Sequence, residues 1–409
     1  MKNGEAFIEL NGRSGLDYYL RAECHAATPP FIRVWKNDPA SPPVFIPAVA
    51  ESEFRVTIKS PGTRLFVSRE EISIEEYRCW RLPDVWKLAR LRRFKKYTRY
   101  DDADVRIQPL LHGSEEGLGV ARAVRSAAQW GFGTSMRSLQ RTLSYEFTNH
   151  TESAKGVASA LSIAIVVDLY YDELWPDFES RLSRLSLPFT LIVTTVKTRP
   201  LLADRIRASF PDAKIVNYPN RGRDVGRFIQ ILRDKHLDKF DLVCKVHGKK
   251  SATLGPQAVF GDIWRRSMLN DLLGSDRHVK TIVDRFAAEP SVGLIGPARF
   301  RLPNEYRHSY VDTWGRGNEL ITKELAAKLG YPREEFILDF FAGTMFWIRK
   351  DLLDLLKPLD LSLDSFPDEE GQTDGTLQHA LERLFGALPG LANPKMKTEE
   401  ATLSTELLP

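Results

Sequence analysis

Apolar and polar positions alternate along the chain in two different ways, one up to residue 80 and the other after residue 157. In the first region, short β-prone runs such as 31–35 and 54–58 are separated by Pro, Gly, Asn and Asp. This pattern is typical of short strands joined by turns. It predicts a smaller β-rich N-terminal module at 1–80, in which no residue pattern indicates a particular chemistry.

After residue 157, strand-like apolar runs alternate with amphipathic segments. Strands are expected at 163–167, 189–193, 214–216, 241–244, 292–296 and 343–348, and helices at 177–185, 201–210, 224–234, 351–356 and 376–384. Repeated strand-helix-strand order predicts a mostly parallel sheet with helices on both faces. We therefore expect an α/β, Rossmann-like domain at 158–409.

The intervening residues 81–157 are predicted to form a helical, basic connector. Apolar residues at helical spacing in 85–100 are interleaved with a basic run, namely Lys87, Arg90, Arg92, Arg93, Lys95, Lys96 and Arg99. Such a helix could contact an anionic membrane surface. The preferred interpretation is a helix packed on its own protein, with a solvated basic face.

Charge, cysteine content and hydropathy indicate which partners and which cellular compartment to expect. The formal net charge is only +4 over 409 residues, but this total hides the local basic run, so partners have to be inferred from that clustering. No nucleic-acid partner is expected. Three scattered cysteines, Cys24, Cys79 and Cys244, support neither a disulfide framework nor a Cys-based zinc site and fit a reducing cytosol. No apolar stretch is long enough for a transmembrane helix. We expect a cytoplasmic protein, or one held peripherally at the inner face of the plasma membrane.

Two polar segments follow predicted strands, where an open α/β sheet builds its ligand site. The first is 220–226 (Asn-Arg-Gly-Arg-Asp-Val-Gly) and the second is 245–251 (Lys-Val-His-Gly-Lys-Lys-Ser). The glycines of the first segment allow close approach of a phosphate, Arg221 and Arg223 could bind a diphosphate, and Asp224 is expected to N-cap the next helix. The alternative is a capped helix with two surface arginines.

Further polar segments at 341–347 and 374–379 complete a set that, in this order, resembles the rhamnan-synthesis F family. Its members are glycosyltransferase-like proteins of bacterial surface polysaccharide assembly. The resemblance covers 158–409, and 169–174 is also similar, with Asp168 where a His is expected. It implies a GT-A-like fold and transfer of a sugar, often L-rhamnose, from a nucleotide-diphosphate donor. The implied acceptor is a glycan or lipid-linked glycan of an O-antigen, capsule or rhamnan.

The resemblance also implies the donor site. His247 and Lys249 occupy the place where GT-A enzymes usually carry an Asp-x-Asp metal motif. Cations there could neutralise the leaving diphosphate directly, so a divalent metal is possible but not indicated, and no metal ligand is assigned. The residues expected to bind the nucleotide-sugar donor are Asn220, Arg221, Arg223, Asp224, His247, Lys249 and Gly343. Exposed lysines at a strand end and a tightly packed Gly343 are the structural alternatives.

Sugar transfer with inversion needs one base to take the proton of the acceptor hydroxyl, and one carboxylate suffices. Asp374, before the predicted helix at 376–384, is the candidate base, and Glu370 competes with it. Asp374 could instead be a plain N-cap. Trp314 could stack on an acceptor sugar or be a buried anchor.

Two classes of function remain: a glycosyltransferase, and a non-catalytic carbohydrate-binding or assembly-scaffold protein of the same fold. Convergence of Asp374, Arg223, His247 and Lys249 would favour the enzyme. A Rossmann dehydrogenase is disfavoured because no Gly-x-Gly-x-x-Gly follows 163–167.

Overall fold

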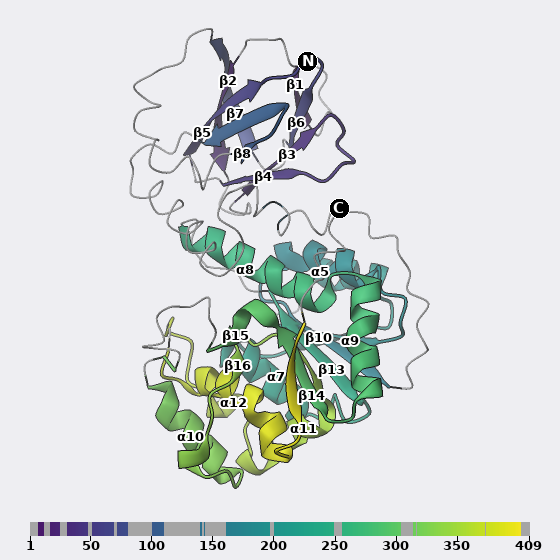
Figure 1. Ribbon diagram of the computed structural model, residues 1–409, viewed down its shortest axis with the longest axis vertical. Coiled ribbons are helices and arrows are strands. Elements are labelled where there is room, and N and C mark those ends of the chain that lie inside the picture. The colour runs from purple at the N-terminus through teal and green to yellow at the C-terminus, as the bar shows by residue number, and fades with distance from the viewer. Residues whose placement is uncertain are drawn as a thin grey trace. The chain divides into compact units, whose positions relative to one another are not determined.

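The computed structural model describes residues 7–11, 17–24, 31–47, 51–68, 72–80, 100–109, 140, 143, 161–196, 200–248, 256–303, 314–315, 317–372 and 374–401. The chain divides into two compact units (Figure 1). One consists of Met1–Asn149 with Lys249–Ser267, and the other of His150–Gly248 with Met268–Pro409.

The N-terminal unit contains two antiparallel sheets, which confirms the β-rich pattern. The four-stranded sheet has the order β1-β6-β3-β4, and the five-stranded sheet has the order β7-β2-β5-β9-β8. Their strands are β1 (Phe7–Asn11), β2 (Asp17–Cys24), β3 (Phe31–Lys36), β4 (Val44–Pro47), β5 (Glu51–Ile58), β6 (Arg64–Ser68), β7 (Ile72–Trp80), β8 (Tyr100–Asp101) and β9 (Val105–Pro109).

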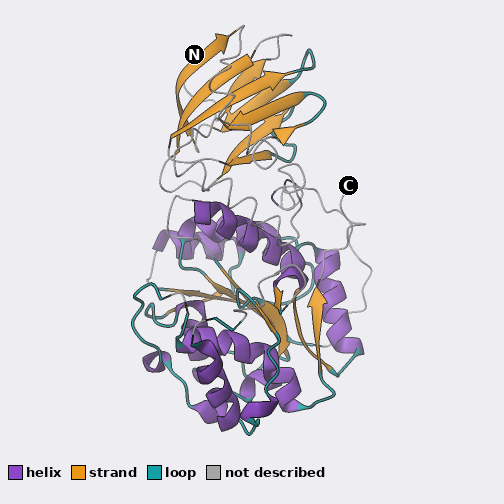
Figure 2. Ribbon diagram, turned by 60° about the vertical axis from the view of Figure 1, so that its left-hand side comes forward, coloured by secondary structure: helices purple, strands orange, loops and turns teal. Residues whose placement is uncertain are grey.

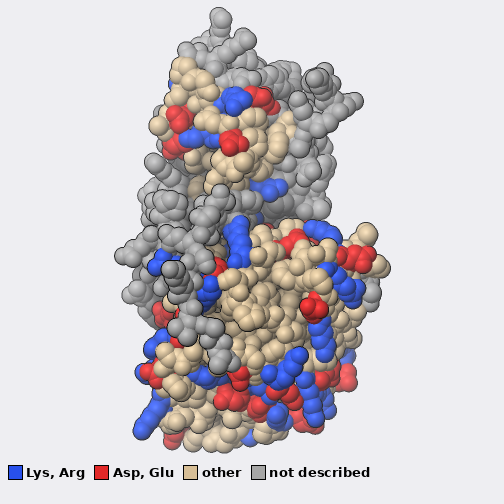
Figure 3. Space-filling view, turned by 90° about the vertical axis from the view of Figure 1, so that its right-hand side faces the viewer, with Lys and Arg blue, Asp and Glu red and all other residues tan. Residues whose placement is uncertain are grey.

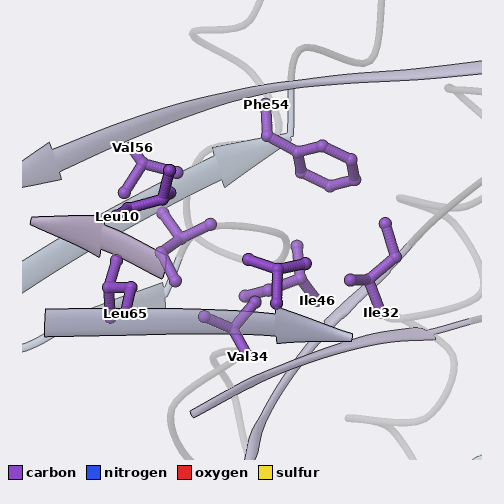
Figure 4. A pocket seen from close by; sticks show the side chains of 9 residues that line it. Leu10, Ile32, Val34, Ile46, Phe54, Val56 and Leu65 are labelled. Carbon is purple, nitrogen blue, oxygen red and sulfur yellow. The ribbon is translucent and has the colours of Figure 1, made fainter. Parts of the chain in front are cut away.

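Apolar side chains from both sheets form the core of this unit. Figure 4 shows them around a small cavity, and all of its lining residues are apolar: Leu10, Ile32, Val34, Ile46, Phe54, Val56, Leu65, Val67 and Ile107. Successive side chains of a strand point to opposite faces, so each strand contributes every second residue to this core. Burial of this face stabilises the N-terminal unit.

The structure corrects the predicted connector at residues 100–109. These residues form β8 and β9, and β9 pairs with β5 from Phe54↔Pro109 to Ile58↔Val105. Ile107 is buried in the core described above, so alternate apolar positions extend the β module to Pro109. The basic segment 81–99, on which the predicted membrane contact depends, lies outside the described residues.

The second unit is built on a seven-stranded sheet with the order β12-β11-β10-β13-β17-β14-β18. Among its described strands only β17 runs antiparallel to its neighbours, which confirms the predicted mostly parallel sheet. The strands are β10 (Ile163–Asp168), β11 (Thr190–Thr195), β12 (Lys214–Asn217), β13 (Leu242–His247), β14 (Val292–Pro297), β17 (Phe346–Arg349) and β18 (Lys397–Ala401). A separate two-stranded ladder pairs β15 (Arg301–Leu302) with β16 (Phe340–Phe341).

Helices cover both faces of this sheet (Figure 2). They are α5 (Trp175–Leu182), α6 (Pro200–Ser209), α7 (Arg223–Arg233), the part of α8 (Pro256–Leu273) from Met268 onward, α9 (Asp276–Ala288), α10 (Asn318–Lys328), α11 (Lys350–Asp354) and α12 (Leu377–Ala392). On one face, α7, α10, α11 and α12 share an apolar cluster with Val166, Val243 and Ile348 of the sheet. Strand residues two positions apart point to the same face, so Asp168, Lys245 and His247 continue these rows toward α7.

No helix among the described residues is long and apolar enough to cross a membrane. Figure 3 shows acidic and basic side chains interspersed on the visible described surface of this unit. Arg285 and Glu399, for example, form a surface ion pair with a nitrogen-oxygen distance of 2.6 Å.

Candidate functional site

The candidate site lies at the carboxyl edge of β10 and β13 and at the start of β17. The strand β13 ends at His247. Lys245 of β13 lies opposite Phe346, the first residue of β17. Because β17 is antiparallel, the loop before it reaches the same edge as the end of β13. This topology brings the predicted segments 220–226, 245–248 and 341–344 together.

A buried ion pair joins the end of β10 to α7. Asp168 is 5% exposed and Arg227 is 2% exposed. Arg227 donates through Nε to Asp168 Oδ1 and through Nη2 to Asp168 Oδ2 at 2.7 Å, and Thr194 Oγ1 donates to Asp168 Oδ1 at 2.7 Å. Arg227 Nη1 also donates to Asn220 Oδ1 at 3.0 Å. Asn220 was predicted to bind the nucleotide-sugar donor. Its side chain is oriented by Arg227, a residue that the sequence had not indicated as part of the site.

Lys245 is the centre of a second charged group. Its side chain is 1% exposed, and its Nζ donates to Asp224 Oδ2 at 2.5 Å and to the Thr344 carbonyl at 2.8 Å. His247 Nε2 lies 2.7 Å from the Gly343 carbonyl and 3.9 Å from Asp224 Oδ2. Burial alone raises the pKa of Asp224, but the charges of His247 and Lys245 outweigh it and hold that pKa below its usual range.

Asp224 is not the N-cap of α7, so that prediction was wrong. The N-cap is Gly222, whose φ is +61°, and Asp224 is the second residue of the helix. The physical reason is the ion pair with Lys245, which keeps the Asp224 carboxylate directed toward the sheet. Asp224 and Arg227 are three residues apart and therefore share the helix face that packs on β10 and β13.

Close packing, rather than an approaching ligand, accounts for the two glycines of 220–226. A Cβ on Gly226 would lie 2.1 Å from the Arg221 carbonyl oxygen, and a Cβ on Gly222 would lie 2.3 Å from the ring of Phe366. Gly222 also has a positive φ, which favours glycine. Both glycines therefore let the turn before α7 fold back tightly.

Replacement of Gly226 by Ala is expected to lower the free energy of unfolding by about 1–3 kcal/mol, because backbone has to move to admit the methyl group. Gly390 offers a matched control, since it lies in α12 and a Cβ there would meet no atom within 4 Å. Gly390→Ala is expected to be neutral or to stabilise by up to about 1 kcal/mol. Urea unfolding of both variants measures the difference, and equal effects would contradict the packing argument.

Arg221 and Arg223 are both engaged by an acidic segment, residues 364–369. Arg221 donates through Nε and Nη2 to Asp368 Oδ1, at 3.0 and 2.7 Å. Arg223 binds Glu369 with both ends of its fork, Nε to Oε2 at 2.9 Å and Nη2 to Oε1 at 2.8 Å. The hydrogen bond from Arg223 is the main reason that the pKa of Glu369 lies below its usual range. The fork of Arg223, which binds two oxygens, matches the geometry that carboxylates and phosphates share, whereas Arg221 donates twice to one oxygen of Asp368.

The loop before β17 is fixed by Glu382 of α12. Glu382 Oε1 accepts hydrogen bonds from the Gly343 amide at 2.6 Å and from Thr344 Oγ1 at 3.0 Å. Gly343 and Thr344 both have a positive φ, of 103° and 53°. Glu382 thus holds a strained backbone turn, and the Gly343 carbonyl of this turn contacts His247. Because Glu382 belongs to α12, the helix that follows Asp374, this helix links the surroundings of His247 to those of the candidate base.

Asp374 is exposed, with 37% of its side chain accessible, but it is held in place. Its Oδ1 accepts a hydrogen bond from Asn318 Nδ2 at 2.7 Å, and Arg383 Nη2 lies 3.7 Å from the same oxygen. The N-cap of α12 is Thr376, so Asp374 precedes the cap and the alternative of a plain N-cap is wrong. The competing base, Glu370, is exposed.

His379 lies among charged residues from both the predicted donor-binding segment and the region of the candidate base. Burial is the largest cause that lowers the pKa of this imidazole. Arg223 and Arg383 lower it further, whereas Glu382 and Asp374 act in the opposite direction. Arg223, His379 and Asp374 therefore belong to one electrostatic group, although Arg223 is far from the other two in the sequence.

Trp314 and Lys249 are the last two of the predicted site residues. Trp314 is partly buried, its ring centroid lies 5.7 Å from that of Phe336, and Lys323 Nζ lies 5.8 Å from its centroid. It is at least partly an anchor, and stacking on an acceptor remains a prediction. Lys249 lies outside the described residues. The described part of the chain contains no group of three or more His, Cys, Asp or Glu residues placed to hold a metal ion.

Comparison with known proteins adds a family match. The sequence pattern of rhamnan synthesis protein F matches residues 134–392. An uncharacterized protein, WxcX, from two strains of Xanthomonas campestris pv. campestris is 30% identical over 249 residues, which are 61% of this chain. The chain spans only 34% of the length of these curated relatives.

Solved structures give a weaker match. Two structures of glucosyl-3-phosphoglycerate synthase from Mycobacterium tuberculosis, one with Mn²⁺, UDP and glucosyl-3-phosphoglycerate and one with phosphoglyceric acid, align with 47% of this chain and 58% of theirs. Their sequence identities are 15% and 17%, and both TM-scores are 0.26.

Proposed function

Because the chain belongs to the rhamnan synthesis protein F family, we propose that it is a glycosyltransferase of cell-surface polysaccharide synthesis. It would transfer a sugar from a nucleoside-diphosphate donor to a glycan, with L-rhamnose as the first donor sugar to test. The finer fold proposed is GT-A-like, supported by the mostly parallel sheet with helices on both faces.

The observation that carries this proposal is the charged group at the carboxyl edge of the sheet. Asp168 with Arg227 and Asp224 with Lys245 are buried pairs that require a specific geometry. Buried pairs contribute little net stability compared with apolar residues of the same shape. A site that must orient polar groups toward a charged ligand gives a reason for their presence there.

The donor diphosphate is proposed to bind near Arg223 and His247 at the start of α7. The N-terminus of this helix adds a positive potential, and Asn220 and Asp224 would face the nucleoside side. Arg223 has to exchange the Glu369 carboxylate for a phosphate, which presents similar oxygens to the guanidinium fork. Cationic side chains would then balance the leaving diphosphate, with or without a divalent metal.

If the diphosphate replaces Glu369 at the Arg223 guanidinium, removal of the Glu369 charge should strengthen nucleotide binding. Glu369→Gln removes the competing negative charge, so nucleoside diphosphates are expected to bind about threefold to tenfold more tightly. Asp360→Asn is the matched control, because Asp360 forms an exposed pair with Arg233 at the other end of α7. Calorimetric titration measures both affinities. Unchanged or weaker binding to Glu369→Gln would count against Arg223 as a diphosphate ligand.

The reaction step assigns the base role to Asp374. Its carboxylate would take the proton of an acceptor hydroxyl while the hydroxyl oxygen forms a bond to the anomeric carbon of the donor. The bond from this carbon to the diphosphate oxygen breaks at the same time, and the electron pair leaves with the nucleoside diphosphate. Attack opposite the leaving group inverts the anomeric configuration. The partial exposure of Asp374 would allow an acceptor to reach it.

A second candidate, a non-catalytic glycan-binding or assembly protein, is favoured by one observation. Arg221 and Arg223 are already neutralised by carboxylates of the same chain. A protein that never binds a diphosphate would keep both pairs permanently. This alternative predicts glycan binding without nucleotide binding.

A panel of nucleoside diphosphates and their sugars tests the proposal by thermal unfolding, with Mn²⁺ and with EDTA. A ligand that binds the folded state raises its apparent stability according to its affinity. Selective stabilisation by one nucleotide, followed by its release from the matching nucleotide sugar in the presence of a glycan, would support the transferase. No response to any nucleotide at millimolar concentration would favour the second candidate.

A further inference from the structure

We propose that Asn318 is a positioning residue that fixes the orientation of Asp374 and links it to the Trp314 backbone. This inference rests on the proposed function, in which Asp374 is the base. Asn318 is 0% exposed, although it carries a polar amide, and it is the first residue of α10. A buried amide in this position requires partners for both of its ends.

All the groups around the Asn318 amide belong to the candidate base and its neighbouring loop. Its Nδ2 donates to Asp374 Oδ1 at 2.7 Å and to the Trp314 carbonyl at 2.9 Å. Its Oδ1 accepts from the Gly375 amide at 2.9 Å. Both Asp374 and the peptide that follows it are therefore held by one side chain, which leaves little freedom to the carboxylate.

Gly315 gives an independent indication that this arrangement is tightly constrained. A Cβ at Gly315 would lie 2.5 Å from Asp374 Oδ1 and 2.6 Å from Asn318 Nδ2. The φ of Gly315 is +70°, which also disfavours other residues. The backbone thus approaches both members of the pair at a place where no side chain fits.

Helix packing makes the support of Asn318 rigid. Thr322 is 0% exposed, and its single Oγ1 hydrogen is shared between the Asn318 carbonyl at 2.8 Å and, as the weaker branch, the Ala380 carbonyl at 3.3 Å. These bonds join α10 to α12, the helix that follows Asp374. Asn318 is consequently held on the same pair of packed helices as the carboxylate it contacts.

The geometry has a chemical consequence for proton transfer. The contacts of Asp374 with Asn318 and Arg383, as described, both reach Oδ1. Oδ2 would then be the oxygen that takes the proton of an acceptor hydroxyl. Asn318 would act through Asp374 and need not touch the substrate.

Asn318→Asp tests this role through the pH dependence of transfer. It places a second carboxylate within hydrogen-bond distance of Asp374, and two such groups share a proton. The midpoint of the acidic limb of kcat is expected to rise by about one pH unit or more, which is a tenfold loss of rate well below that midpoint. KM is expected to change by less than about threefold, because substrate contacts are retained.

Glu319→Gln is the matched control, because Glu319 is the next residue of α10 and forms an exposed pair with Lys323. It is expected to keep the wild-type kcat and midpoint. A purely structural role for Asn318 would reduce the folded fraction of Asn318→Asp without moving the midpoint. An unshifted midpoint in the folded variant would overturn the proposal.

A second readout separates this inference from the proposed function. The carboxyl carbon of Asp374 can be titrated by NMR in ¹³C-labelled protein, with its signal assigned by comparison with Asp374→Asn. A higher titration midpoint in Asn318→Asp supports the coupling even if the wild-type protein transfers no sugar. Absence of a shift overturns the coupling, whereas absence of wild-type turnover contradicts only the function.

Discussion

Asp374→Asn is expected to lower kcat for sugar transfer by about 10²–10⁴-fold while the protein stays folded. The amide cannot take a proton from the acceptor hydroxyl at any accessible pH. Its oxygen can still accept the hydrogen bond from Asn318, so the loop keeps its main described support. Nucleoside-diphosphate release measured under saturating substrate gives kcat, and thermal unfolding reports the fold.

Glu370→Gln is the control for this experiment, because Glu370 is the competing carboxylate. It is exposed and directly follows the acidic segment 364–369, and its side chain is expected to contribute little to transfer. The two variants therefore distinguish the candidates directly. A large loss in Glu370→Gln with normal turnover in Asp374→Asn would transfer the role of base to Glu370.

Arg227→Met is expected to give the largest loss of stability, about 3–5 kcal/mol, because it leaves the Asp168 carboxylate buried without its cation. Asp168 would retain the hydrogen bond from Thr194, which does not neutralise the charge. Asn220 would also lose the hydrogen bond from Arg227. Urea unfolding of the full-length protein, followed by its helical circular dichroism signal, measures the effect.

The same helix supplies the control for Arg227→Met. Arg233 ends α7, and its ion pair with Asp360 is exposed, with 44% and 86% of the two side chains accessible. Arg233→Met is expected to cost no more than about 1 kcal/mol. If both substitutions had the same small effect, the Asp168–Arg227 pair would not be the structural link described above.

Local patterns were sufficient to predict the class of architecture and six of the seven strands of the large sheet, but the helices α8, α9 and α10 and the strand β18 were not predicted. The apolar run at 163–167 and its successors have the length and spacing of buried parallel strands, and β10 to β13 form at those places. The expected ends of the elements were less accurate. The strand β13 continues through Lys245 to His247, because a charge that is paired with Asp224 can be accommodated in a buried strand.

The partners within the site could not be predicted, because they come from distant parts of the chain. Arg223 binds Glu369, which is 146 residues away in the sequence, and Asn318 binds Asp374 across 56 residues. No single-sequence pattern specifies such pairs. One signal was available for Arg227: it shares a helix face with Asp224 and lies between apolar residues that are buried.

The role of the glycines in 220–226 was also beyond the sequence. A glycine that allows a phosphate to approach and a glycine that allows a carbonyl to approach look alike in a sequence. Only the position of the Arg221 carbonyl beside Gly226 distinguishes these explanations. The remaining predicted donor contacts depend on a ligand and require experiments with one.

The most direct test of the central claim is a crystal structure of the protein with the nucleoside diphosphate selected by the binding panel. The proposed function predicts the diphosphate at the carboxyl edge of β10 and β13, within about 3 Å of the Arg223 guanidinium or the His247 ring. In that structure the hydrogen bonds between Glu369 and Arg223 would be broken, and the Asp374 carboxylate would face the position of the donor sugar next to the diphosphate. A nucleotide bound elsewhere, with the Arg223–Glu369 pair intact, would contradict the assignment of this edge as the donor site.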